Sequence, residues 1–158
     1  MTIRNILVPT DFSAGSEEAV RYAFDLARSL GATLHILHVL ENPFAPGAFM
    51  EMYAPPPAEY FLDLERRAEE KLRATLTPEQ KQEVPVVMTT RLGVPATEIL
   101  DRLNEEPKLD LVVMATHGRG GVARLLMGSV TDKIIRSAPC PVVTMRNYPG
   151  GATTERAA

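Results

Sequence analysis

The sequence has little cysteine, no tryptophan and few histidines, and these scarcities narrow the chemistry open to it. Cys140 is the only cysteine among 158 residues, so no disulfide can form within the chain, and a reducing cytoplasm is the expected location. No apolar run approaches the ~20 residues of a membrane-spanning helix, so we expect no membrane association. The net charge of −3 comes from 17 basic and 20 acidic residues without a basic tract, which argues against nucleic-acid binding.

The motifs of common phosphate-handling and hydrolytic enzymes are also missing. The lysine of the Walker A pattern GxxxxGK[ST] is absent, no GxGxxG follows the first apolar segment, and no GxSxG predicts a nucleophile elbow. His35 and His38 are three residues apart in an apparent strand, so they point to opposite faces and are poor candidates for a metal pair. We therefore expect no metal centre and no enzyme activity beyond, at most, slow hydrolysis of a bound nucleotide.

What the chain does contain is a regular alternation of strand-like and helix-like segments. Ala19, Ala23 and Leu30 belong to a helical apolar stripe that Gly31 is placed to end. Three further helices are expected over about 58–76, from Pro95 onward, and after the glycine-rich stretch 115–130. The apolar runs that predict strands are 3–8, 32–40, 84–92, 109–116 and 140–146.

This alternation predicts one α/β domain, a doubly wound, open parallel five-stranded sheet with helices on both faces. We place the domain at 1–146 and expect a flexible tail over 147–158. Prolines at 43, 46, 55, 56 and 57 interrupt the pattern, so 41–57 is predicted to be a loop insertion. Long loops in compact domains often form lids or binding segments, and the sequence does not choose between a flap over a ligand and a partner contact.

For a flavodoxin-like strand order of 3-2-1-4-5, a ligand would lie in the crevice beyond the carboxyl ends of strands one and four. The segments that leave those strands are "PTDFS" and "THGRGG". Asp11 would there either contact the ligand or serve only in a helix cap or an Asx-turn. The other candidate site residues from these two segments and the strand ends are Pro9, Thr10, Met114, Thr116, His117 and Arg119.

The glycine-rich stretch "ATHGRGGVARLLMGSV" is a candidate phosphate-binding element. Gly118 permits backbone conformations that let amides point at an anion, and Gly128 leads into the last helix. Ser129, followed by Asp132 three residues on, resembles a capping box with Asp in place of Glu. The free N–H groups from Gly128 to Thr131 would favour a phosphate. Ser129 could cap its helix, bind phosphate, or exchange between the two.

The same stretch resembles the motif G-x2-G-x9-G-[ST] of the ATP-binding members of the universal stress protein family. Gly118, nine residues and Gly128-Ser129 match the motif, and Ala115 replaces its first glycine. The resemblance extends over about Ile3 to Met145 and includes "NILVPTDFS", "LHVLE" and "APCPVVTMR". If the family glycine is needed for a positive φ or for very close approach of the ligand, alanine would weaken binding. If Ala115 has extended geometry at the end of its strand, the replacement is expected to be harmless.

The resemblance implies the 3-2-1-4-5 sheet and a regulatory role in stress adaptation, with ATP, together with Mg²⁺, as ligand. It also implies a homodimer joined through the last strand, Val142 to Met145. Asp11 would contact the ribose or adenine end, and Val39 would line the adenine pocket. The residues that it assigns to the triphosphate, largely through backbone amides, are Gly118, Gly128, Ser129 and Val130. The alternative, kept open by Ala115, is a dimeric interaction protein of the same fold that binds no nucleotide.

Overall fold

The computed structural model describes residues 2–41, 58–116 and 129–145. Most of the Pro-rich segment 41–57 and the whole tail 147–158 lie outside the described residues. So do His117, Gly118, Arg119 and Gly128 of the candidate site. The elements, in chain order, are β1 (Asn5–Thr10), α1 (Ala14–Leu30), β2 (Thr33–Leu40), α2 (Ala58–Ala74), α3 (Pro78–Glu83), β3 (Val86–Leu92), α4 (Pro95–Asn104), β4 (Leu111–Ala115), α5 (Ser129–Ser137) and β5 (Val142–Met145).

The five strands form one parallel sheet in the order β3-β2-β1-β4-β5, as predicted. The β1–β2 ladder contains six register pairs and the β2–β3 ladder seven, whereas β4–β5 contains four. The β1–β4 ladder contains only two, Ile6 with Leu111 and Leu7 with Val112. The sheet is therefore least continuous between β1 and β4, where the direction of strand addition reverses.

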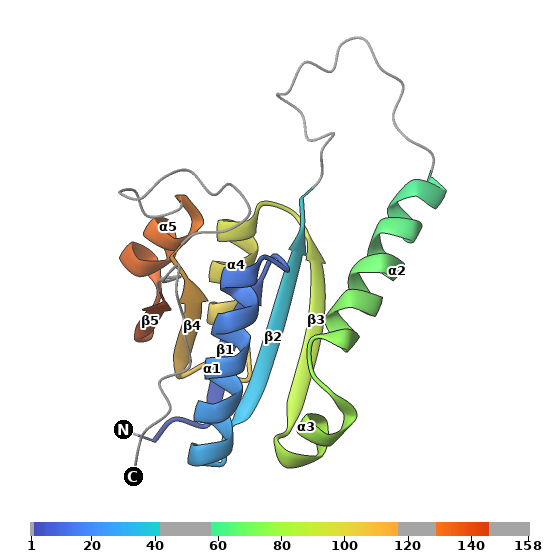
Figure 1. Ribbon diagram of the computed structural model, residues 1–158. Helices are drawn as coiled ribbons and strands as arrows, with labels where there is room; N and C mark the ends of the chain where they lie inside the picture. The colour runs from blue at the N-terminus through green and yellow to red at the C-terminus, as the bar shows by residue number, and fades with distance from the viewer. Residues whose placement is uncertain (1, 42–57, 117–128, 146–158) are drawn as a thin grey trace.

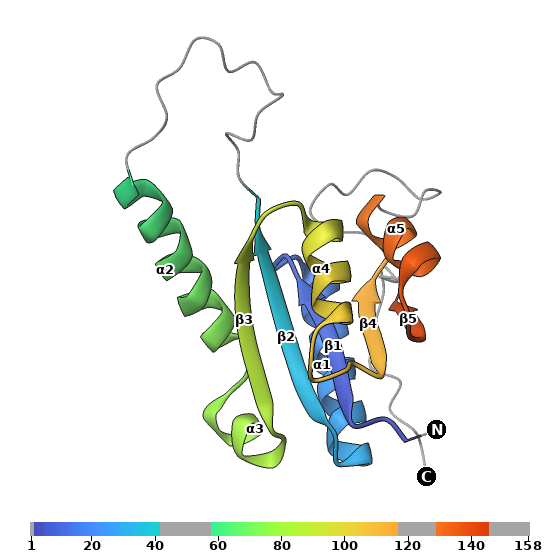
Figure 2. The same ribbon diagram turned by 180° about the vertical axis from the view of Figure 1, so that it is seen from behind.

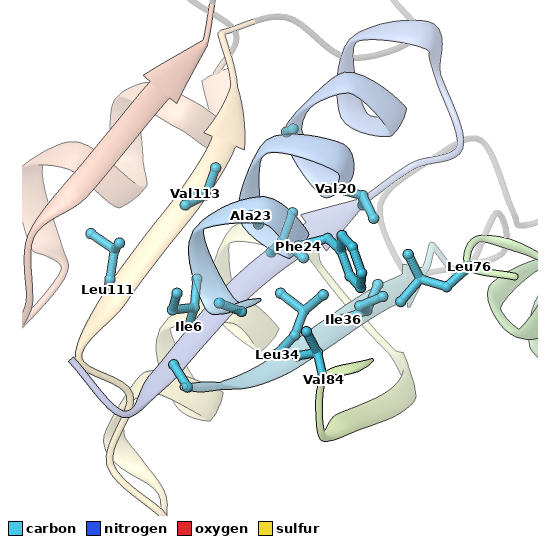
Figure 3. Packing of buried hydrophobic residues seen from close by; sticks show 14 of the residues in the cluster. Ile6, Val20, Ala23, Phe24, Leu34, Ile36, Leu76, Val84, Leu111 and Val113 are labelled. Atoms are coloured by element: carbon cyan, nitrogen blue, oxygen red, sulfur yellow. The ribbon is translucent and has the colours of Figure 1, made fainter. Parts of the chain in front are cut away.

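Helices cover both faces of the sheet, with α1 and α2 on one face and α4 and α5 on the other (Figures 1 and 2). Successive strand residues point to opposite faces. Ile6 and Val8 thus join the cluster beneath α1, and Leu7 joins the cluster beneath α4 and α5. Burial on both faces explains the almost unbroken apolar runs of the central strands. Figure 3 shows the cluster beneath α1, where Phe24 packs close to Leu34 and Ile36.

Helix α1 begins and ends for reasons that are visible in the sequence. Ser13 is its N-cap, and the Ser13 side chain accepts a hydrogen bond from the amide of Ser16 at 3.4 Å. Gly31 follows the last turn with φ 63°, in the left-handed region that glycine enters at low cost. The predicted stop at Gly31 is confirmed.

The described residues contain five helices, one more than predicted. The additional helix is α3, which has six residues and no buried side chain, so no apolar periodicity marks it. Its signal is instead a capping box, in which Thr77 and Gln80 exchange side-chain and backbone hydrogen bonds, with Pro78 in the first turn. Helix α2 ends at Ala74, two residues before the predicted end at Leu76.

A buried polar cluster lies at the amino-terminal half of β2, beneath α4. His35 is 4% exposed and Arg102 8%. The Arg102 guanidinium approaches His35 Nδ1 at 3.4 Å and donates to the Pro107 carbonyl at 3.3 Å. Because arginine only donates, Nδ1 is the acceptor, and His35 donates from Nε2 to Asn5 Oδ1 at 3.1 Å. In this arrangement the imidazole of His35 is neutral, and each of its two ring nitrogens has a hydrogen-bond partner.

Candidate functional site

The candidate site lies where the chain leaves β1 and β4. The β1–β4 ladder ends at Leu7 and Val112, before either strand ends. After β1 the chain enters α1 on one face of the sheet, and the next helix after β4, α5, lies on the other face (Figures 1 and 2). This is the topological switch point at which open α/β sheets bind ligands.

Asp11 lies in the turn between β1 and α1 and is half-buried. Its Oδ1 accepts two hydrogen bonds from Ser13, from the amide at 3.1 Å and from the hydroxyl at 2.6 Å. Of the two structural roles left open for Asp11, the Asx-turn is therefore observed, whereas the helix cap is supplied by Ser13. An Asx-turn holds the carboxylate at the switch point and is compatible with ligand contact.

Thr10 is buried and ties the end of β1 to its surroundings through both its carbonyl and its hydroxyl. The hydroxyl lies 3.1 Å from Ser16 Oγ and accepts a hydrogen bond from the Phe12 amide at 3.1 Å. The carbonyl lies 2.7 Å from His38 Nδ1, and since a carbonyl only accepts, that nitrogen carries the hydrogen. The Thr10 side chain is thus engaged within the turn, and Pro9, which precedes it, is half-buried in β1.

On the other side of the switch point, the first turn of α5 is joined to the end of β4. The Thr131 hydroxyl donates to the Ala115 carbonyl at 2.9 Å, and Thr131 is buried. The Thr116 amide donates to the Met145 carbonyl at 2.8 Å, so the backbone hydrogen bonding of β4 with β5 continues one residue past Ala115. These contacts place the N-terminal turn of α5 beside the carboxyl end of β4.

Ala115 is the last residue of β4. Among the described residues, Phe12 is the only non-glycine residue with a positive φ, so the φ of Ala115 is not in the left-handed region. The backbone condition for a harmless replacement is therefore met, since no positive φ requires glycine here.

The expected capping box of α5 is not formed by Asp132. Within the described part of the chain, no hydrogen bond joins Asp132 to Ser129; both carboxylate oxygens of Asp132 accept from Arg136 Nε, at 3.0 and 3.1 Å. An i,i+4 ion pair on the helix surface has taken the place of the box. Ser129 itself is exposed in the first turn, which leaves its side chain accessible to a ligand.

Three apolar candidates come together on the face covered by α4 and α5. Met114 is buried in that core cluster, and Val39 and Val130 pack against its margin. They come from β4, β2 and α5 respectively, so residues far apart in the sequence belong to or adjoin one apolar cluster. Asp11 and Thr10 adjoin the opposite core through Phe12, which packs against the cluster beneath α1.

Phe12, His38 and Lys71 are site neighbours that the sequence did not indicate. Phe12 has φ 61°, its ring centroid lies 4.3 Å from that of His38, and Lys71 Nζ lies 5.8 Å from it. No sequence pattern marks a left-handed phenylalanine, and Lys71 reads as one of many charges on an exposed helix face.

Two kinds of site are not seen in the part of the chain that the structure describes. No three histidine, cysteine, aspartate or glutamate side chains lie close enough there to hold a metal ion. Among the described helices, none is both long and apolar enough to span a bilayer.

Comparison with known proteins agrees with this architecture over almost the whole chain. The model of the universal stress protein family matches residues 2–146. A universal stress protein of Methanocaldococcus jannaschii is 31% identical over 144 residues, covering 90% of this chain and 82% of the relative.

Two solved structures show the same fold. The universal stress protein UspA from Lactobacillus plantarum has a TM-score of 0.70 at 22% identity, covering 92% of this chain and 99% of that one. The universal stress protein from Archaeoglobus fulgidus, solved in complex with dAMP, has a TM-score of 0.60 at 22% identity, covering 91% and 98%. With the family match and the M. jannaschii relative, the conclusion is that this chain belongs to the universal stress protein family.

Proposed function

We propose that this protein binds ATP, together with Mg²⁺, at the β1/β4 switch point and acts as a regulatory stress-response protein of the cytoplasm. The binding unit is the single domain 1–146. The observation that carries the proposal is the start of α5 at Ser129, directly after the motif glycine Gly128, with its first turn held against the end of β4 by Thr131. Helix N-termini present unpaired amides and a positive dipole end, which suit phosphate.

The surroundings of that helix start supply groups for the rest of an adenine nucleotide. Val39 and Val130, half-buried at the margin of the cluster that contains Met114, would offer apolar contacts for the base. Asp11 offers carboxylate oxygens for the hydroxyl or amine donors of the nucleoside. The A. fulgidus relative, solved in complex with dAMP, supports an adenine nucleotide as the ligand class. Gly118, His117 and Arg119, which belong to the same motif region, complete the proposed set of phosphate neighbours.

Magnesium fits this site as a companion of the phosphates. Mg²⁺ keeps several waters and is usually held by one or two carboxylates together with nucleotide phosphates. The carboxylate in the β1–α1 turn is Asp11, whose Oδ1 is already engaged by Ser13. The ion would therefore be held mainly by the nucleotide, and would offset phosphate charge rather than activate a bound water.

We assign a regulatory rather than an enzymatic role because the sequence has no Walker lysine and no second-substrate motif. Isothermal titration of the purified protein with ATP and Mg²⁺ tests the proposal. We expect saturable binding that weakens in Asp11→Ala, while Tyr22→Ala, an exposed change on α1, serves as the matched control. Negligible ATP binding by folded wild type refutes the proposal.

A second proposal concerns assembly. β5 lies at the edge of the sheet, and within the described residues only β4 pairs with it. Three of its four residues are half-buried and Thr144 is exposed, so it is an apolar edge that a second copy could extend. We propose a homodimer through Val142–Met145. Val143→Lys or Thr144→Pro should weaken it, and a monomeric wild type in sedimentation at micromolar concentration refutes it.

The dimer also defines the alternative function, an interaction protein that binds no nucleotide. Replacement of the first motif glycine by Ala115 is the feature that favours it. An acid extract of the purified protein, analysed for co-purifying nucleotide, distinguishes the two functions. Ala115→Gly tests whether Ala115 limits nucleotide binding. The extended backbone at this position predicts that the variant will bind ATP with nearly the affinity of wild type.

A further inference from the structure

We infer that Phe12 is a positioning residue, whose ring is held between β2 and α2 and which thereby fixes the Asp11 carboxylate for the nucleoside part of the ligand. The inference rests on the proposed nucleotide site and adds a residue to it. Phe12 is not part of the glycine motif and has no polar side-chain atom, so it would act only through its neighbour.

The backbone at Phe12 is the first observation. Its φ of 61° makes it the only non-glycine residue with positive φ among the described residues. Aromatic residues seldom adopt this conformation, so the surrounding contacts must hold it in place. One of them is local, since the Phe12 amide donates to the Thr10 hydroxyl at 3.1 Å.

The environment of the ring is the second observation. The Phe12 and His38 ring centroids are 4.3 Å apart with an interplanar angle of 37°. His38 is itself buried and bonded to the Thr10 carbonyl at 2.7 Å. From α2, the Lys71 ammonium lies 5.8 Å from the Phe12 centroid, within the range of cation–π attraction. The ring is thus held by two elements other than its own.

The consequence for Asp11 follows from its place in the chain. It lies between Thr10, whose carbonyl and hydroxyl are both bonded, and Phe12, whose ring lies near His38 of β2 and Lys71 of α2. Its Oδ1 is held by the Ser13 amide and hydroxyl. The carboxylate is therefore oriented before any ligand arrives, and preorganisation of this kind lowers the entropic cost of binding.

The class of ligand contact follows from the chemistry of a carboxylate. An ionised carboxylate only accepts hydrogen bonds. Asp11 would therefore accept hydrogen bonds from hydroxyl or amine groups of the nucleoside and would not bind the phosphates. Loss of the Phe12 ring should therefore lower the affinity for ATP, ADP and AMP by the same factor. An effect on the phosphate chain would instead grow with the number of phosphates.

A double-mutant cycle tests the inference. Phe12→Gly keeps a residue that tolerates positive φ but removes the ring, and we expect ATP affinity to fall on the order of tenfold, about the effect of one hydrogen bond to a charged group. In an Asp11→Ala background, Phe12→Gly should lower ATP affinity little further, because the carboxylate through which Phe12 acts is absent. Phe12→Tyr, which retains the ring, should bind ATP like wild type.

The controls separate this inference from the function on which it rests. Wild type that binds no nucleotide removes both. Wild type that binds, with Phe12→Gly at full affinity or with multiplicative losses in the double mutant, overturns the positioning role alone. A Phe12→Gly loss that grows from AMP to ATP also overturns it. Thermal unfolding verifies that each variant is folded, and Phe12→Leu replaces Phe12→Gly if the glycine variant is not.

Discussion

Acidification should destabilise this protein through His35, in a window that the buried cluster beneath α4 defines. Burial, and secondarily the Arg102 guanidinium, lowers the pKa of His35 below its usual 6.5. The unfolded chain therefore takes up the proton first. Stability due to His35 is complete above about pH 6.5, is lost as the pH falls toward the folded-state pKa, and levels off below it.

The magnitude follows from the contacts. Protonation would place an N–H at Nδ1, where the Arg102 guanidinium now donates at 3.4 Å, so two donors of like charge would face each other in a buried site. The loss cannot exceed about 1.4 kcal/mol per pH unit for one proton. Between about pH 6.5 and 5.5, we therefore expect His35 to remove up to about 1 kcal/mol from the free energy of unfolding.

Urea unfolding of wild type and His35→Gln at half-unit pH steps measures this contribution. Glutamine offers an oxygen acceptor and an N–H donor but does not titrate, so subtraction of its curve removes the carboxylate contributions common to both proteins. Wild type should lose more stability than His35→Gln between about pH 6.5 and 5.5 and no more above pH 7. Parallel curves over the whole range would show the reasoning to be wrong.

Three further outcomes follow from single contacts. Gly31→Ala should cost about 1–2 kcal/mol of unfolding free energy, because its φ of 63° is left-handed, and Gly31→Asn less; equal losses in urea titrations would contradict this. Thr131→Val should cost about 1–3 kcal/mol because it leaves the Ala115 carbonyl without its side-chain donor; an unchanged denaturation midpoint would argue against that contact. Burial and Asp110 raise the pKa of the Cys140 thiol, so iodoacetamide should alkylate it more slowly in folded than in urea-unfolded protein, and equal rates would refute this.

The fold could be predicted because its signals repeat over many residues. Strands such as β1 and β4 are buried on both faces and appear as plain apolar runs, and α1 combines a helical apolar stripe with Gly31 as its stop. Strands that alternate with helices along the chain and are joined by short connections leave few arrangements besides a parallel sheet covered on both sides. Helix α3 was not predicted because none of its side chains is buried and its only sequence signal is its capping box.

The site could be predicted only in outline. Strand order places the turn at Asp11 and the end of β4 together, which the structure confirms. The choice of partner within each turn was not predictable, because several groups compete locally: Ser13 rather than Asp11 caps α1, and Asp132 pairs with Arg136 instead of the helix start. The left-handed Phe12 depends on contacts with β2 and α2, which local sequence does not encode.

The division of the core between two faces also bears on how the protein is made. Leu7 and Leu37 lie in the first two strands, yet the cluster they join is completed by residues of α4 and α5, such as Ile99 and Ile134. During N-to-C synthesis, helices α1 and α2 can cover one face early, while the other face stays bare until α4 and then α5 emerge. A ribosome-bound chain paused after β3 is therefore a natural client for chaperones that recognise exposed apolar strands.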